Sequence, residues 1–307
     1  MDYKLIAKNI LTQYNIDVKI LDRYDESHRF YHNWNHIEYM FQIALKEDIL
    51  LTDELSLAII FHDIIYDPKF KDNEEQSADL FYSLIKNDEI KQAILDTKTH
   101  KNFSSELSKK LCYLDLHNIY NDFEVFYNNS YNVFKEYQFV DFSIYKKKRR
   151  EFLELYHVDP IYIKAVNGFK PNIGVYAGSF NKFHKGHYDI LTKAENIFDK
   201  VIIARGINPE KNNDISKLPE ILSHRQIETY NGLLTDFIDT LDYNVTLIRG
   251  LRNSTDLQYE LTQYKYLLDF KPDIKVISIF CDKQYEHISS SALRSLEKYG
   301  KSNDYLI

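Results

Sequence analysis

The amino-acid sequence predicts two domains of different architecture. An all-α helical bundle is expected over residues 1–165, and an α/β domain with a parallel sheet over residues 172–307. The length of 307 residues allows two domains of about 150 residues, each with its own core. All eight glycines lie at or beyond Gly168. Because glycine serves the tight strand-to-helix turns of α/β folds and is disfavoured inside helices, this asymmetry predicts a change of fold class near the middle of the chain.

The first half of the sequence has helical periodicity. In HIEYMFQIALKE, residues 36–47, the apolar side chains Ile37, Met40, Phe41 and Ala44 recur at the spacing of one helix face. DELSLAIIFHDIIY, residues 53–66, is apolar almost all round, which is typical of a central helix in a bundle. The basic run KKKRR at 146–150 leads into another apolar periodic segment, so we interpret it as a solvated helix face rather than a polyanion or targeting patch.

The second half has the alternating strand and helix pattern that is typical of a parallel sheet. Pro160, Gly168 and Pro171 punctuate the join, which we place between residues 158 and 172. After the join, short β-rich runs alternate with helical segments. These runs are IGVYAG at 173–178, KVIIAR at 200–205, NVTLI at 244–248 and IKVISIF at 274–280.

Composition excludes several classes of function. A formal net charge of −7 argues against a broad nucleic-acid surface, which needs a basic face. The apolar runs fall short of the roughly 20 residues that span a bilayer, and no signal peptide opens the chain, so we expect a cytoplasmic protein without a membrane partner. The two cysteines, Cys112 and Cys281, are far apart and indicate neither a disulfide framework nor a cysteine zinc site. Any metal must therefore be bound by histidines and carboxylates.

Four segments of the second half carry phosphate chemistry. GSFNKFHKGHYDIL at 178–191 reads as a strand end, a glycine turn and a helix N-terminus, which together make an anion site. NPEK at 208–211 supplies a lysine after the second strand, and RGLRNSTDLQYE at 249–260 supplies two arginines suited to phosphate oxygens. HISSSALRSL at 287–296 places serines at a helix start, where they could also serve simply as caps.

In their order and approximate spacing these segments resemble phosphopantetheine adenylyltransferase, of the HxGH nucleotidyltransferase superfamily. The resemblance covers residues 172–307 and implies a Rossmann-like nucleotidyltransferase fold. It implies transfer of AMP from ATP to 4′-phosphopantetheine, which gives dephospho-CoA and pyrophosphate in coenzyme A biosynthesis. It also implies Mg²⁺ bound with ATP and a homo-oligomer, often a hexamer.

The resemblance implies a role for each matching residue. His187 would stabilise charge on the α-phosphate, while Lys211 and Arg249 would hold the phosphate of phosphopantetheine as catalytic and substrate-binding groups. Ser179 would contact both ATP and the acceptor, and Leu234 would touch the pantetheine arm. The remaining residues implied to contact ATP are Phe180, His184, Gly250, Leu251, Arg252, Glu260, Tyr285, Ser289, Ser290 and Ser291.

Three positions depart from that family's pattern. Asn181 and Lys182 replace its usual Asp-Pro, and His184 stands where threonine is common. Nicotinate mononucleotide adenylyltransferases tolerate an asparagine and carry HxGH, so nicotinate or nicotinamide mononucleotide is the alternative acceptor. We expect these three positions to bear on acceptor specificity.

The first half contains a candidate metal site. His32 and His36 are four residues apart, His62 and Asp63 are adjacent on an apolar segment predicted to be helical, and Asp115 lies on another segment. A histidine beside an aspartate in a buried helix is costly unless both are paired or bind metal. Oxygen and imidazole donors suit Mn, Fe, Zn, Co or Mg.

The order H, HD, D resembles the HD-domain metal-dependent phosphohydrolases over roughly residues 1–160. YHNxxH, FHDIIYDP, DNEEQSA and LDL carry this resemblance. It implies His36, His62, Asp63 and Asp115 as metal ligands, with His32 behind them or at the substrate. Glu74 or Glu75 could manage protons. Tyr113 stands where that branch often has an aspartate.

The leading hypothesis is a bifunctional enzyme, with a metal-dependent phosphohydrolase of unknown substrate fused to an adenylyltransferase. The alternatives are a degenerate helical domain that serves assembly or regulation, and a nucleotide sensor whose second domain binds without turnover.

Overall fold

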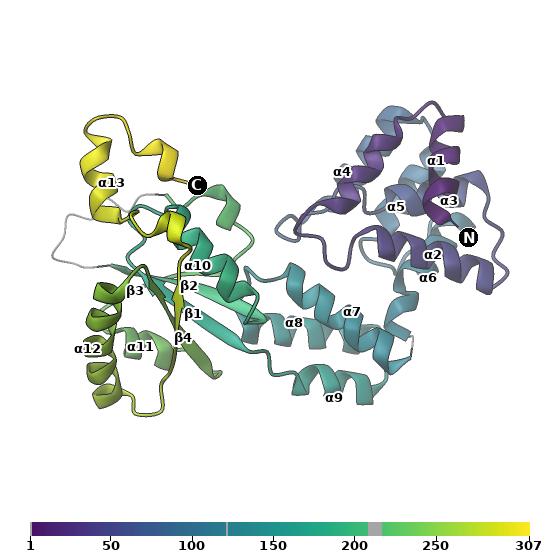
Figure 1. Cartoon of the computed structure of the whole chain (residues 1–307). Coiled ribbons are helices and arrows are strands. Elements are labelled where there is room, and N and C mark those ends of the chain that lie inside the picture. Colours follow the sequence, from purple (N-terminus) through teal and green to yellow (C-terminus); the bar gives the residue numbers. More distant parts are fainter. Residues whose placement is uncertain (1, 121, 208–216) are drawn as a thin grey trace. The chain divides into compact units, whose positions relative to one another are not determined.

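The computed structural model describes residues 2–120, 122–207 and 217–307. The chain divides into two compact units (Figure 1). The first comprises Met1–Tyr137 and Lys148–Gly168, and the second comprises Gln138–Lys147 and Phe169–Ile307. Residues 138–147, which fall inside the predicted N-terminal domain, thus group with the second unit.

In the part of the first unit that the structure describes, all regular structure is helical (Figure 1). Its helices, with α8 shared between the units, are α1 (Tyr3–Gln13), α2 (Trp34–Lys46), α3 (Asp53–Phe61), α4 (Asn73–Leu84), α5 (Asp88–Asp96), α6 (Glu106–Leu116), α7 (Phe123–Glu136), α8 (Phe142–Leu155) and α9 (Pro160–Gly168). The short 3-10 helices η1 (Val18–Asp25) and η2 (His117–Tyr120) connect them.

The helical core follows from the apolar pattern. Ile37, Met40, Phe41 and Ala44 on α2 are fully buried, as their spacing predicts. Every residue of α3 from Leu55 to Phe61 is buried as well, so this helix lies at the centre of the unit. The helix ends at Phe61, so His62 and Asp63 lie just beyond it rather than on it. A smaller cluster joins α7, α8 and α9.

The second unit contains a five-stranded parallel sheet in the order β3-β2-β1-β4-β5. The strands are β1 (Ile173–Gly178), β2 (Lys200–Ile207), β3 (Ile227–Asn231), β4 (Val245–Leu251) and β5 (Lys275–Phe280). The helices are α10 (Lys185–Glu195), α11 (Leu234–Asp239), α12 (Ser254–Phe270) and α13 (Ser290–Glu297), with 3-10 helices η3 (Glu220–Leu222), η4 (Lys283–Tyr285) and η5 (Asn303–Tyr305). Helix α10 covers one face, and α11 and α12 lie on the other (Figure 1). The order reverses at β1, so the carboxyl ends of β1 and β4 form the crevice where such sheets bind ligands.

A buried lysine ties residues 138–147 to the sheet. Lys200, at the start of β2, is 1% exposed, and its ammonium donates to the carbonyls of Gln138 and, at 2.9 Å, Val140. Tyr243 adds a hydrogen bond of 2.6 Å to Asp141. Burial lowers the pKa of Lys200 to about 7.

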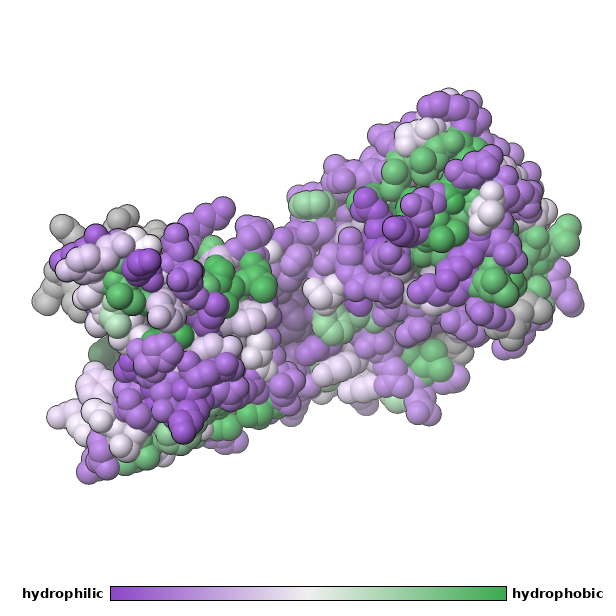
Figure 2. Space-filling view, turned by 45° about the horizontal axis from the view of Figure 1, so that its top comes forward, coloured by the Kyte–Doolittle hydropathy of each residue, from purple (hydrophilic) through white to green (hydrophobic). Residues whose placement is uncertain are grey.

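Helix α12 is unusual because none of its described residues is buried. Tyr259, Leu261, Tyr266 and Phe270 are between 47% and 63% exposed on it. The view in Figure 2 shows a mainly hydrophilic surface interrupted by hydrophobic patches. Among the described residues, no helix has the length and apolar character needed to cross a membrane.

Candidate functional sites

A cavity of about 550 Å³ opens at the carboxyl ends of β1 and β4. The N-terminal turns of α10, α12 and α13 surround it, so three sets of helix amides contribute positive partial charge. Nine of the predicted nucleotide residues line it together: His184, His187, Gly250, Leu251, Arg252, Glu260, Ser289, Ser290 and Ser291. Three of the four motif segments therefore converge on one site, although they span more than 100 residues of the chain, while NPEK at 208–211 lies outside the described residues.

The two histidines of the motif interlock at the start of α10. His184 is the N-cap, and its Nδ1 accepts from the His187 amide at 3.4 Å. The His187 Nδ1 accepts in return from the His184 amide at 3.4 Å, and the rings stack with centroids 3.6 Å apart. Because each Nδ1 is an acceptor, each Nε2 carries the proton and is a donor.

Both imidazoles are held neutral. Burial, and then the positive charge of Arg252, lowers the pKa of His184 to about 4. Burial also lowers the pKa of His187, with His184 and Arg252 adding to the effect. His187 therefore meets an anion as a neutral N–H donor across the physiological pH range.

The arginines of the second motif are paired with carboxylates in this structure. Arg252 makes a two-point ion pair with Asp256, with Nε and Nη2 each 2.8 Å from a carboxylate oxygen. Arg249 contacts Glu260 through Nε at 2.5 Å. Arg252 and both carboxylates line the cavity, whereas Arg249 does not and reaches it only through its partner Glu260. An incoming phosphate would have to share or displace these carboxylate partners.

Four other predicted residues, Ser179, Phe180, Leu234 and Tyr285, do not line the cavity. The Ser179 carbonyl accepts from Arg205 at 3.2 Å. Phe180 is only 2% exposed, and its ring stands edge-on to His187 with centroids 5.2 Å apart. Tyr285 ends η4, and Leu234 begins α11. Lys211 lies outside the described residues.

The motif positions that depart from the family also have defined surroundings. Lys182 forms an ion pair with Glu297 of α13, so its charge is already balanced. Asn181 is exposed. Ser289 caps α13 by accepting from the Ala292 amide at 3.1 Å while it also lines the cavity, so its capping and cavity-lining roles coexist.

A second candidate site lies in the helical unit. One ligand atom from each of His36, His62 and Asp115 can be chosen so that all lie within 4.8 Å of one another. The His36 Nε2 is 3.1 Å from Asp115 Oδ1, and the His62 Nε2 is 3.1 Å from Asp63 Oδ2. Asp63 also approaches His36 to 3.9 Å. All four predicted ligands thus converge from α2, the end of α3 and α6.

The hydrogen-bond pattern of His62 leaves a lone pair facing the cluster. Its Nδ1–H donates to the Ile59 carbonyl at 2.9 Å, so Nε2 is unprotonated in the neutral ring. That buried Nε2 has no partner with hydrogen-bonding geometry among the described residues, although carboxylate oxygens are near it. An orphaned acceptor among carboxylates is the arrangement that a cation satisfies.

The electrostatics of the cluster favour positive charge. Burial by itself raises the pKa of Asp63, but His62 more than offsets it, and the pKa stays below its usual range. Burial likewise opposes ionisation of Asp115, whereas hydrogen bonds from His100, His36 and His62 hold its pKa well below normal. These carboxylates raise the pKa of His62 despite its burial. The site therefore attracts either a proton or a metal cation.

His32 lies before α2, which begins at Trp34, so the two histidines of YHNWNH do not share a helical turn. Its Nδ1 is 2.6 Å from Glu136 at the end of α7. Glu74, in the first turn of α4, has its pKa raised chiefly by burial. Glu75 pairs with Lys98.

Two residues of this site were not foreseen from the sequence. His100 donates from Nε2 to Asp115 Oδ2 at 2.7 Å, on the side of the carboxylate away from His36. Glu136 is 1% exposed and holds the 30–32 segment through hydrogen bonds. Both lie far along the chain from the HD motif, where local patterns carry no signal.

Comparison with known proteins identifies the family to which the second unit is similar. A cytidylyltransferase-like family model matches residues 175–296. The chain is 31% identical over 138 residues to a phosphopantetheine adenylyltransferase of Clostridium tetani, covering 42% of this chain and 86% of the relative. It is 30% identical over 148 residues to that of Rhodopirellula baltica, covering 45% and 82%. It is also 30% identical over 141 residues to that of Levilactobacillus brevis, covering 42% and 84%.

The family model lies entirely within the second unit, at the parallel sheet and the cavity described above. This match supports a nucleotidyltransferase fold and activity for the unit. The relatives named above narrow the family to phosphopantetheine adenylyltransferases. Through this C-terminal unit, the chain belongs to the phosphopantetheine adenylyltransferase family.

Proposed function

We propose that the C-terminal unit transfers AMP from ATP to 4′-phosphopantetheine, releasing pyrophosphate. The observation that carries this proposal is the convergence of the interlocked histidines, Arg252 and the α13 serines on one cavity. The attacking phosphate is already an anion and needs no general base, so the site acts by alignment and charge stabilisation. His187 would donate its Nε2–H to the α-phosphate, and the helix amides would orient the remaining phosphate oxygens.

Magnesium would enter this cavity with ATP. The cavity carboxylates Asp256 and Glu260 are each paired with an arginine, so ATP phosphates rather than these side chains would hold most of the ion. When bound, Mg²⁺ would neutralise the pyrophosphate leaving group. The protein's own part is to hold the arginines and the histidine N–H at fixed positions.

The acceptor is tested by pyrophosphate release. Purified protein with ATP and Mg²⁺ is expected to release pyrophosphate with 4′-phosphopantetheine and not with nicotinate or nicotinamide mononucleotide. Release with a mononucleotide alone would establish the alternative acceptor. Release with none of them would favour a nucleotide sensor. Lys182→Pro with Asn181→Asp restores the family's Asp-Pro and shows whether these positions affect the acceptor preference.

We also propose that the C-terminal unit assembles as a homo-oligomer, specifically a hexamer. Support comes from α12, which has no buried residue among those described and exposes Tyr266 and Phe270. An apolar face of this kind is typical of a protein interface. β5 also lies at an open edge of the sheet.

For the helical unit we propose metal-dependent phosphohydrolase activity. His36, His62, Asp63 and Asp115 would hold a divalent ion, and their donor types fit Mn, Fe, Zn, Co or Mg. When bound, such an ion would polarise a phosphoryl oxygen and acidify a water molecule. Glu74, whose pKa is raised, is suited to accept or return a proton.

Metal analysis of the purified full chain tests this proposal. We expect about one bound divalent ion per chain after incubation with Mn²⁺ and removal of excess, and loss of that ion in His62→Ala. Lys98→Ala, which alters an exposed neighbour outside the donor set, is the matched control. Absence of bindable metal, with His62→Ala as stable as the wild type, would favour a degenerate helical domain.

A further inference from the structure

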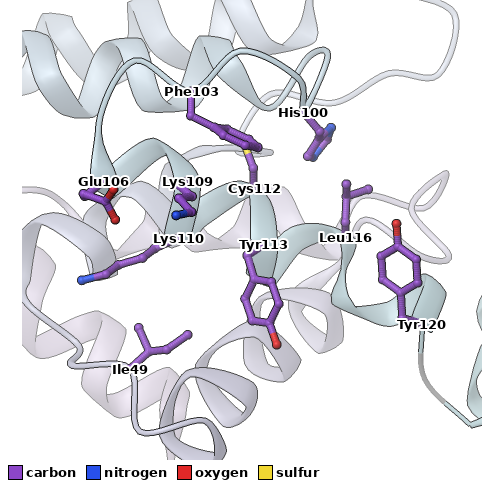
Figure 3. Close-up of a pocket in the computed structure, with 10 residues that line it drawn as sticks. All are labelled: Ile49, His100, Phe103, Glu106, Lys109, Lys110, Cys112, Tyr113, Leu116 and Tyr120. Atoms are coloured by element: carbon purple, nitrogen blue, oxygen red, sulfur yellow. The ribbon is translucent and has the colours of Figure 1, made fainter. Parts of the chain in front are cut away.

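A second pocket lies in the helical unit beside α6 (Figure 3). Its volume is about 340 Å³, within the range of small-molecule sites. Side chains of α6, the segment before it and the 3-10 helix after it form its walls. Asp115 does not line it, so the pocket is distinct from the cluster of proposed metal ligands.

One end of this α6 pocket is positively charged. Lys109 and Lys110 line it beside Glu106, and Figure 3 shows the three grouped on one side of the pocket. Within residues 2–120, 122–207 and 217–307, neither lysine forms an ion pair. Glu106 lies four residues before Lys110 on the same helix, yet its carboxylate is not within ion-pair distance of the Lys110 ammonium. Two unpaired ammonium groups in a chain of net charge −7 are available to an anionic ligand.

Three aromatic side chains line the rest of the pocket together with His100, Ile49, Cys112 and Leu116. Phe103 is 48% exposed, Tyr113 47% and Tyr120 55%. Three half-exposed rings that line one pocket offer flat apolar faces for stacking. The pocket thus combines an aromatic region with a cationic end.

His100 connects this pocket to the metal cluster. Its ring lines the pocket while its Nε2–H donates to Asp115 at 2.7 Å. The backbone of His100 has φ +51°, in the left-handed region that non-glycine residues rarely adopt. Tyr156 donates to the preceding carbonyl of Thr99 at 2.8 Å and braces this turn. Backbone strain held in place by its surroundings is common where a side chain has a functional position.

We propose that the α6 pocket binds a nucleoside monophosphate. The base would stack against Tyr113 and its aromatic neighbours, and the phosphate would lie between Lys109 and Lys110. A bound ligand would contact His100 and so influence Asp115. This influence on Asp115 rests on the proposed metal function, whereas binding in the pocket does not.

The test is equilibrium dialysis of AMP against metal-free full-length protein. Because AMP can also enter the nucleotidyltransferase cavity, binding is measured in the wild type and in Arg252→Glu, which blocks that cavity. We expect two AMP molecules per wild-type chain and one in Arg252→Glu. Adding Lys109→Glu and Lys110→Glu to that variant should weaken the remaining site at least about tenfold.

The control carries the same charge change elsewhere in the unit. Lys8→Glu with Lys164→Glu alters two exposed lysines outside the pocket and should leave AMP binding unchanged. Adenosine and inorganic phosphate, each lacking half of the proposed contacts, should each bind more weakly than AMP. Pyrophosphate release should be unaffected by the Lys109 and Lys110 changes.

Three outcomes would overturn the proposal. The first is no AMP binding in Arg252→Glu. The second is equal binding after both lysine reversals. The third is a combined result, in which AMP fails to bind and the chain self-associates in a way that Tyr113→Ser abolishes. That result would identify the pocket as an interface with a second copy of the chain. If AMP binds as expected and Mn²⁺ does not bind, the metal proposal fails while the pocket stands.

Discussion

Removal of the Glu136 carboxylate should sharply destabilise the helical unit. Its Oε1 accepts from three successive backbone amides, those of Phe30 at 2.9 Å, Tyr31 at 2.7 Å and His32 at 2.8 Å. Its Oε2 accepts from the His32 ring at 2.6 Å and from the Tyr66 hydroxyl at 2.8 Å. Five donors therefore depend on one buried carboxylate.

Glu136→Ala leaves these donors without their acceptor. An unsatisfied buried donor costs roughly 1–3 kcal/mol, and water entering the gap would recover part of the sum. We therefore expect a loss of about 3–5 kcal/mol in the free energy of unfolding, the range for breaking a buried charged network. Glu136→Gln keeps one carbonyl acceptor for the backbone amides and should lose less.

The single tryptophan of the chain makes the assay specific to this unit. Trp34 is 9% exposed and lies at the start of α2, immediately after the segment that Glu136 holds. Its fluorescence during urea unfolding reports the free energy of the helical unit. Glu124→Ala, an exposed change on the same helix, should cost at most about 1 kcal/mol. A loss below about 1 kcal/mol for Glu136→Ala would refute the reasoning.

The carboxylate also predicts acid sensitivity. Burial alone would raise the pKa of Glu136, but His32 and the backbone amides outweigh burial and lower it. Because the folded-state pKa is depressed, the stabilisation is present above the unfolded-state pKa and is lost as the pH falls through the folded-state value. The wild type should therefore lose more stability in acid than Glu136→Gln does.

Three further predictions concern the C-terminal unit. His187→Ala should lower the rate of pyrophosphate release about 100-fold or more, and should lower the free energy of unfolding by no more than about 1 kcal/mol. Near-normal turnover would contradict the role proposed for His187. The pKa of Lys200 is about 7 in the folded protein against 10.5 as its reference value, so the unfolded state binds more protons between these values. Between pH 7 and 9 the wild type should gain up to about 1.4 kcal/mol per pH unit relative to Lys200→Met, as measured by urea unfolding, and parallel pH profiles would contradict this. Tyr266→Glu combined with Phe270→Glu should reduce the sedimenting mass if α12 is an interface, and an unchanged mass would exclude that surface.

The sheet was predictable where its strands have continuous apolar runs. The runs at β1, β2, β4 and β5 all form strands. β1 and β2 are buried, and a strand covered on both faces of a parallel sheet is nearly continuously hydrophobic, whereas β5 is an edge strand in which only Ile279 is buried. The prediction did not include β3, IETYN. This strand lies at the sheet edge, where its residues are exposed or half-buried and its sequence has no continuous apolar run.

The sites were predictable only as far as local motifs reach. HKGH and FHDIIYDP each place reactive side chains within a few residues, and the structure brings their members together. His32 and Glu136 are 104 residues apart, and no sequence periodicity links them. The pairing of Lys200 with residues 138–140 is likewise invisible, because a lysine in a strand is ordinarily expected to face solvent.

The mutual capping of His184 and His187 has a consequence for how the transferase site comes into being. The same two residues begin helix α10 and supply the donor for the reacting phosphate. The hydrogen bond from the His184 amide to the His187 Nδ1 caps the helix and also fixes the tautomer of His187. The direction of the His187 Nε2–H is therefore set when the chain folds, before any nucleotide binds. Preorganisation of this kind removes the cost of reorienting a dipole during the reaction.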